Sequence, residues 1–243
     1  MARAGSDLGD NGMGPKLFMK NFFILFALGC VCSLFSQSKE ESRLKAAGDV
    51  LHDIMQMRDK AIPQDLLDKS ECAIVIPGMK KGAFIFGGKY GKGFFTCRKS
   101  DGMGWGAPAA VTAEGGSFGF QAGGSESDIV LLVMNKKGAQ RLLTSQFKLG
   151  GEASVAAGPV GRTSSAQTDA MLTAEILSYS RSRGIFAGLS LEGSTLRQDL
   201  SANKELYGET MTNKEIIDGN PNPPAAAKLL LADLNKYSPH KVK

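Results

Sequence analysis

The first regular pattern of apolar and polar positions is helical. After Ser38, apolar residues recur every three or four positions, at Leu44, Ala47, Leu51, Ile54 and Met55. This spacing predicts an amphipathic helix that runs on to about residue 62. Ser38 and Glu41 have the spacing of a capping box, so we expect the helix to begin there. Pro63 should end it and open a short second helix.

From residue 71 the pattern changes to short apolar runs separated by glycine. Fourteen glycines stand between positions 78 and 124, a density that predicts strands and turns and no helix. The strand candidates are ECAIVIP (71–77), AFIFGG (83–88), GFFTCR (93–98), PAAVTA (108–113), SFGFQAG (117–123) and DIVLLVMN (128–135).

The second half alternates short helices and strands. We expect a helix over 136–145, a small-residue strand over 150–162 with a turn at Gly158, and a hairpin about Gly184. A capped helix over 212–217 and a last helix over 225–237 follow. Together these elements predict an α+β fold: a glycine-rich antiparallel, barrel-like sheet with an N-terminal amphipathic helix and C-terminal helices.

Residues 16–36 form a segment of a different kind. Lys16 and Lys20 precede an apolar run from Phe22 to about Phe35. The run is short for a membrane-spanning helix and is typical of a secretory signal. Cleavage near Ser36 is one expectation, lipidation of Cys30 in the sequence ALGC is another, and an uncleaved anchor helix is a third. The predicted organisation is a signal over 1–37, a domain over 38–208 and a helical extension over 209–243.

Two cysteines remain if that segment is removed. Cys72 and Cys97 both lie in predicted strands. In an exported protein they could form a disulfide, or they could be two buried thiols, and the sequence leaves both open.

Composition argues against several kinds of chemistry. The chain has only two histidines, His52 and His240, so a metal centre or a serine–histidine triad is not expected. GGKYGKGFF (87–95) lacks the ending of a phosphate-binding loop and precedes a strand. We therefore expect no metal, no cofactor and no enzymatic activity. A net charge of +5 permits an anionic partner, although no aromatic ladder accompanies it as in nucleic-acid-binding proteins.

The basic residues of the glycine-rich region are the better candidates for binding. Alternation in YSRSRG places Arg181 and Arg183 on one face of a strand, where two guanidinium groups can bind phosphate. The alternative interpretation is that they solvate a sheet edge and deter edge pairing.

A series of motifs resembles the SYLF domain, a lipid-binding family of bacterial exported proteins and of eukaryotic proteins of endocytosis and actin patches. They are CAIVIP, KKGAFIFGGKYGKG, SDIVLLVMN, AAGPVGR, YSRSRGIFAGLSLEG and NKELYG, in order over about residues 40–208. The resemblance implies binding of phospholipid, of phosphoinositides in eukaryotic members, with a contribution from an N-terminal amphipathic helix. Actin binding is implied for yeast relatives, and no catalysis is.

The resulting hypothesis is non-catalytic binding of anionic phospholipid by a bacterial exported protein, periplasmic or associated with the outer envelope. The proposed lipid contacts are Arg43, Leu44, Lys45, Leu51, Ile54, Met55, Arg58, Lys60, Arg98, Arg181 and Arg183. The alternatives are an envelope module that binds another protein, with actin implied only by the resemblance, and a lipid hydrolase using Ser180 or Asp169.

Overall fold

The computed structural model describes residues 38–57, 61–83, 86–118, 123–160, 173–182, 185–186, 191 and 193–240. The chain divides into two units, Met1–Gln37 and Ser38–Lys243, and the described residues belong to the second. The expected signal segment and Cys30 lie outside the described residues. Within the described part of the chain, no helix combines the length and apolar character needed to cross a membrane.

One sheet organises the second unit. Its strands are β1 (Cys72–Ala83), β2 (Phe86–Cys97), β3 (Ala109–Phe118), β4 (Gly123–Val133), β5 (Gln146–Lys148), β6 (Val155–Ala157), β7 (Ile176–Ser182), β8 (Ile185–Phe186) and β9 (Thr195–Gln198). They lie in the order β5-β9-β3-β2-β1-β4-β7-β6, with β8 beside β7. All described pairs are antiparallel except β6 and β7. The sheet curls, and the predicted α+β class is confirmed.

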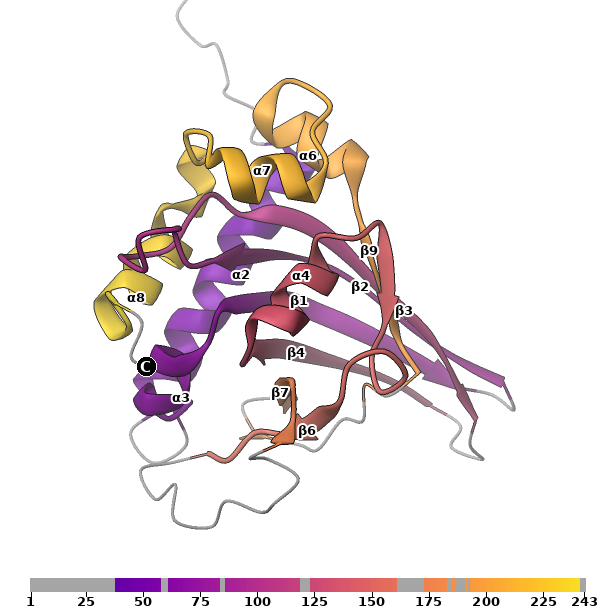
Figure 1. Ribbon diagram of the computed structural model, residues 1–243. Helices are drawn as coiled ribbons and strands as arrows, with labels where there is room; N and C mark the ends of the chain where they lie inside the picture. The colour runs from indigo at the N-terminus through magenta and orange to yellow at the C-terminus, as the bar shows by residue number, and fades with distance from the viewer. Residues whose placement is uncertain are drawn as a thin grey trace, which may run out of the picture. The chain divides into compact units, whose positions relative to one another are not determined.

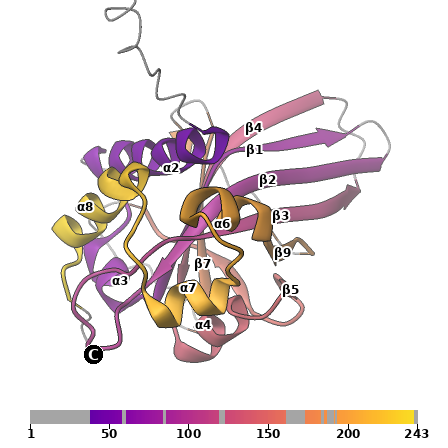
Figure 2. The same cartoon turned by 90° about the horizontal axis from the view of Figure 1, so that it is seen from above.

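Helices surround this sheet. They are α2 (Lys39–Gln56), α3 (Gln64–Lys69), α4 (Lys136–Leu142), α6 (Leu200–Tyr207), α7 (Asn213–Gly219), the 3-10 turn η1 (Ala225–Ala227) and α8 (Lys228–Tyr237). Figure 2 shows α2 and α8 on one side of β1–β4, which we call the helix face, and α4 and α7 on the other, the opposite face. Each face has its own core: Val75, Phe94 and Val130 pack toward the helix face, whereas Ile74, Phe95 and Ile129 pack toward the opposite face.

Local signals explain where the helices begin. Ser38 Oγ accepts a hydrogen bond from Glu41 N–H, and the Glu41 carboxylate accepts one from Ser38 N–H. The predicted capping box is therefore confirmed, but the helix ends at Gln56, earlier than expected. The sequence interpretation missed α6, although Asp199 caps its first turn and Gly208 ends it with φ of 80°.

Strand β1 is longer than ECAIVIP because it continues through a bulge. Its register with both neighbours shifts around Pro77 and Gly78. Gly78 has φ of +58°, which glycine adopts without strain. Asp128 Oδ1 accepts the Gly78 N–H at 3.0 Å, so a carboxylate of β4 fixes the bulge.

Beyond the bulge, the outer halves of β1–β4 extend past the helices (Figures 1 and 2). We call this extension the β-arm and define it as residues 79–83, 86–92, 112–118 and 123–128. Two strands expected in this region were wrong: AFIFGG (83–88) spans the end of β1 and the start of β2, and SFGFQAG (117–123) spans the end of β3 and the start of β4. Apolar and glycine residues continue from one strand into the next, so the sequence pattern did not mark these boundaries.

Candidate functional site

The apolar stripe of α2 is part of the core. Leu44 and Ile54 are 0% exposed, Leu51 is 1% exposed, and Met55 packs partly buried against the same cluster. These four side chains are among the expected lipid contacts. In the structure they pack on the sheet, and their contact with lipid stays a prediction.

The basic residues that border this stripe differ in their contacts and exposure. Arg43 forms an ion pair with Glu40 in the same helix. Lys45 is exposed to solvent. Arg58 and Lys60 lie outside the described residues, so their expected role is an untested prediction.

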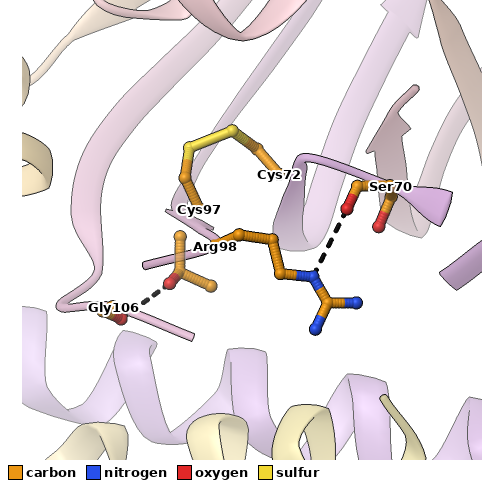
Figure 3. Close-up of a disulfide and its surroundings, with 6 residues drawn as sticks. Ser70, Cys72, Cys97, Arg98 and Gly106 are labelled. Carbon is orange, nitrogen blue, oxygen red and sulfur yellow. Dashed lines mark hydrogen bonds between the residues drawn. A yellow bond between two sulfur atoms is a disulfide. The ribbon is translucent and has the colours of Figure 1, made fainter. Parts of the chain in front are cut away.

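Arg98 forms hydrogen bonds with the C-terminal segment of the chain. Its guanidinium donates to Ser238 O at 2.6 Å and to Leu67 O at 3.1 Å, and it lies 4.1 Å from the centre of the Trp105 ring. In Figure 3 its Nε also points to the carbonyl of Ser70, at 3.4 Å. These contacts give the guanidinium a structural role, and the expected phosphate contact of Arg98 stays a prediction.

The two cysteines of the sheet are joined. Cys72 and Cys97 are directly opposite each other at the base of the β1–β2 hairpin and form a disulfide (Figure 3). Of the two alternatives left open by the sequence, the structure contains the bond.

Arg181 ties α2 to the sheet. Its Nη2 lies 3.0 Å from Asp128 Oδ2 on β4 and 3.3 Å from Asp53 Oδ2 on α2, and its side chain is 11% exposed. Two carboxylates therefore already neutralise the guanidinium that was expected to bind phosphate. Its expected companion Arg183 lies outside the described residues.

A cleft of about 920 Å³ opens beside Arg181 where β1, β4 and β7 meet. Lys80 and Lys81 contribute positive charge to it, and Glu126 and Asp128 contribute negative charge. The cleft therefore contains charges of both signs. Its basic residues are Lys80 and Lys81 of the β-arm, together with Arg181.

The strand register assigns the residues of the β-arm to its two faces. On the helix face, one row across the strands contains Glu114, Tyr90, Lys80 and Glu126. We call it the Tyr90 row. Tyr90 is 51% exposed and lies directly opposite Lys80, which is also exposed. An exposed aromatic ring therefore adjoins an exposed ammonium group.

A row of glycines follows the Tyr90 row toward the end of the arm. Its members are Gly116, Gly88, Gly82 and Gly124. At the first three, an added Cβ would meet no described atom within 4 Å, so the backbone here is open. The sequence interpretation noticed the lysines near these glycines but did not select them as site residues. The signal that could have selected them is the alternation of lysine and glycine in KKG and GKYGKG.

The residues of a serine hydrolase mechanism are not brought together, because Ser180 would need a histidine beside it. Ser180 is 7% exposed and pairs in the sheet with Ile129, a residue of the opposite face. His52 lies on α2, and its Nδ1 is 2.8 Å from Asp233 Oδ2 on α8. The sheet therefore separates Ser180 from His52, while Asp169 lies outside the described residues. The described residues contain no group of His, Cys, Asp and Glu arranged to hold a metal ion.

Comparison with known proteins gives the family. Residues 114–237 match the Ysc84 family, whose description reads "Las17-binding protein actin regulator". The chain belongs to the Ysc84 family. This is the SYLF family that the sequence motifs resemble, and its match extends beyond residue 208 into the C-terminal helices.

Similar members of the Ysc84 family come from yeasts and mammals. An SH3 domain-containing protein of Schizosaccharomyces pombe is 35% identical over 206 residues, covering 82% of this chain and 47% of that protein. LAS seventeen-binding protein 3 of Saccharomyces cerevisiae is 34% identical over 198 residues, covering 80% of this chain and 42% of that protein. The human SH3 domain-containing YSC84-like protein 1 is 30% identical over 207 residues, covering 83% of this chain and 60% of that protein.

The chain thus spans about half the length of the curated relatives it matches. These relatives are eukaryotic, so they give no support to a bacterial, exported origin, which stays a prediction.

Proposed function

We propose that this Ysc84-family protein binds anionic phospholipid at a membrane surface without catalysis, and that the β-arm makes the contact. The observation that carries the proposal is the adjacency of exposed Tyr90 and exposed Lys80 beside a row of open glycines. A tyrosine ring favours the boundary between lipid and water, and a lysine beside it can reach the head groups.

The charge of the arm favours an anionic surface. Each basic residue near such a surface contributes about 1 kcal/mol, and salt screens this attraction. Two acidic residues of the arm are already engaged, Glu114 with Arg197 and Asp128 with Arg181. Lys80 and Lys81 are therefore only partly opposed by neighbouring carboxylates.

In this proposal the β-arm is the membrane-binding surface, and the apolar stripe of α2 is not. Because the apolar side chains of α2 are core residues, removing the helix would expose the sheet and would not test lipid binding. Substitutions on exposed arm residues leave the core intact. A loss of lipid binding in such variants therefore comes from the changed surface and not from unfolding.

Vesicle flotation tests the proposal. The full chain should float with vesicles that contain phosphatidylserine or a phosphoinositide, float poorly with phosphatidylcholine alone, and bind less as salt rises. The double variant Lys80→Gln with Tyr90→Ser should lower anionic vesicle binding about tenfold, because it removes a charge and an interfacial ring.

The matched control is a double variant whose two substitutions lie outside the β-arm. Lys136→Gln with Lys228→Gln changes two exposed lysines, on α4 and α8. If the arm variant, folded by circular dichroism, binds as well as this control does, the β-arm is not the membrane surface.

A second candidate function is binding to the actin machinery, and the family description is the observation that favours it. The descriptions and names of relatives mention Las17 binding and actin regulation. Co-sedimentation of the full chain with actin filaments tests this candidate, and retention of the chain in the supernatant at micromolar filament concentrations would reject it.

We also propose that residues 16–36 direct the chain to export. The basic residues followed by a short apolar run support this. Intact mass from the native host tests it, and a mass that retains residues 16–36 would contradict cleavage.

A further inference from the structure

We propose that the outer end of β4, residues 123–127, is a docking edge for an extended peptide segment of a partner protein. The segment adds to the sheet as a further strand and presents a basic residue followed, two positions later, by an aromatic residue. The inference does not rest on the proposed function, because it concerns the main-chain edge of the β-arm and a protein partner.

Along its outer end, β4 has a described neighbour on one side only. Its pairing with β1 continues through residues 123–127, whereas its pairing with β7 stops at Asp128, opposite Arg181. Strand β8 does not fill the gap, since Arg181 also pairs with Phe186 of β8. Because a strand has two edges, β8 lies on the edge of β7 that faces away from β4. No described strand therefore pairs with the outer end of β4 on this side.

The even-numbered residues of β4 direct their main-chain groups toward this open side. Just past the strand, Met134 N–H donates to Glu175 O, and within it Glu126 O accepts a hydrogen bond of 3.1 Å from Ser182 Oγ. The extra residue of the bulge lies in β1, so the alternation of antiparallel pairing along β4 continues to Gly124. The N–H groups of Glu126 and Gly124 can thus bond an added strand.

The cleft of about 920 Å³ lies along this edge. Its lining includes residues 124–128 of β4, together with Arg181 and Ser182 at the end of β7. In Figure 2, β4 forms one edge of the β-arm and β3 forms the other. The cleft therefore occupies the space into which β7 would extend if it continued beside β4. A segment bound there follows the line of β7 and runs antiparallel to β4.

Glu126 favours a basic residue in the added segment. Its side chain is exposed and forms no ion pair with a described residue. Its carboxylate lies near Gly78, on an exposed side chain that can turn toward the open edge. Asp128, the next acidic residue on this face, is already paired with Arg181 at 3.0 Å. Because opposite charges on directly facing residues of two strands attract, a basic residue fits opposite Glu126.

The glycine at this edge favours an aromatic residue two positions further on. Gly124 lies directly opposite Gly82 of β1, and both are exposed. A Cβ added to Gly82 would meet no described atom within 4 Å. Side chains two positions apart on a strand share a face, so the residue that follows the basic one by two lies beside Gly124. An aromatic ring there covers the open backbone of both glycines.

A second copy of this chain does not supply this chemistry from its own open edges. The outer end of β4 reads GGSES (123–127), and the outer end of β3 reads GGSF (115–118). Neither contains a basic residue, and the first contains no aromatic residue. The charge of Glu126 and the space at Gly124 therefore favour a different protein as the partner.

Titration of the full chain with a blocked peptide, Ser-Thr-Arg-Thr-Tyr-Thr-Ser, tests the docking edge. Amide chemical shifts should change most at residues 123–128 and at Ser182. Glu126→Lys should weaken binding of this peptide about tenfold, because an attraction becomes a repulsion. A second peptide with glutamate in place of arginine should show the reverse preference and bind Glu126→Lys better than the wild type.

Two proline variants provide a matched comparison. Gly124→Pro removes a main-chain donor on the open side of β4, and its pairing with β1 is kept. Gly116→Pro makes the same change on the outer side of β3, where Ala110 O accepts from Asp199 N–H and the alternation continues to Gly116. Gly124→Pro should abolish peptide binding, and Gly116→Pro should leave the Kd unchanged. If circular dichroism shows that Gly124→Pro does not fold, the charge exchange at Glu126 decides.

Three results would overturn the proposal. They are the absence of shifts at millimolar peptide, equal losses in Gly124→Pro and Gly116→Pro, and a preference between the two peptides that Glu126→Lys does not reverse. A concentration-dependent dimer that Gly124→Pro abolishes, without peptide binding, would assign the edge to a second copy. Vesicle flotation is read separately: peptide binding without vesicle binding supports the docking edge and rejects the proposed function, and the converse result rejects the docking edge alone.

Discussion

Gly158 lies against the aromatic ring of Tyr179: a Cβ built on this glycine would be 2.2 Å from Tyr179 Cζ. The sequence predicted a turn here, but Gly158 is not among the described glycines with a positive φ. The requirement for glycine is steric, since the ring of a buried tyrosine occupies the space of the side chain.

The variant Gly158→Ala should therefore destabilise the protein by about 1–3 kcal/mol through overpacking. Urea unfolding measures the change. Gly219→Ala is the control, because a Cβ there meets no described atom within 4 Å. Equal unfolding free energies for the two variants would show that Tyr179 moves aside freely.

Loss of the Arg181 side chain should loosen α2. Arg181→Met leaves Asp128 and Asp53 without their shared cation, and Asp128 also fixes the bulge at Gly78. We expect a loss of about 1–3 kcal/mol in the free energy of unfolding. Hydrogen exchange should also become faster in α2 and around residue 78.

The control for this prediction is Arg197→Met. Arg197 pairs with Glu114, but the two side chains are 48% and 38% exposed. Exposed pairs contribute about 0–1 kcal/mol. A loss as large for Arg197→Met as for Arg181→Met would contradict the assigned role of Arg181.

Acid should weaken the attachment of α6 through Asp199. Lys92 Nζ lies 2.6 Å from Asp199 Oδ2, while Ser201 and the N–H of Ala202 donate to Oδ1. Burial acts to raise the pKa of Asp199, but these hydrogen bonds outweigh it and lower the pKa from 3.8 to about 2. The carboxylate thus stabilises the fold above about pH 4, and this contribution is lost as the pH falls toward 2.

Unfolding curves at several pH values measure this effect. The difference in unfolding free energy between wild type and Asp199→Asn should be largest near neutral pH and should shrink below pH 4. A difference that stays constant from pH 6 to pH 2.5 would rule out Asp199 as the titrating group.

Reduction of the disulfide should destabilise the sheet. The bond closes a segment with a sequence separation of 25, which corresponds to about 3 kcal/mol in the chain-entropy model. Peptide mapping without reductant should recover Cys72 and Cys97 in one linked pair. The double variant Cys72→Ala with Cys97→Ala should unfold at lower urea concentration, and recovery of the two cysteines in separate peptides would contradict the bond.

Local signals in the sequence predicted the helices well. The capping boxes at Ser38 and Thr212 are both present, and the helix expected over 136–145 is α4, which begins after Asn135. Each signal depends on residues close together in the chain, so no tertiary information is needed. The hairpin about Gly184 is also found, with Arg181 opposite Phe186, although Gly184 itself lies outside the described residues.

The site could not be predicted in the same way, because it depends on distant partners. Arg98 is a basic residue beside a strand, but its partner Ser238 is 140 positions away. The stripe of α2 is equally amphipathic on a membrane or on a sheet, and only tertiary packing distinguishes the two. The Tyr90 row exists because four strands pair in a particular register, and a bulge at Gly78 sets that register for β1.

The bond between Cys72 and Cys97 also has a mechanical consequence. It turns the segment from 72 to 97 into a closed covalent ring, so tension along the chain passes through the two sulfur atoms and bypasses the hairpin. A load transmitted from residue 71 to residue 98 therefore cannot unzip β1 from β2. The centre of the β-arm is shielded from force, and under load its outer strands β3 and β4 must yield first.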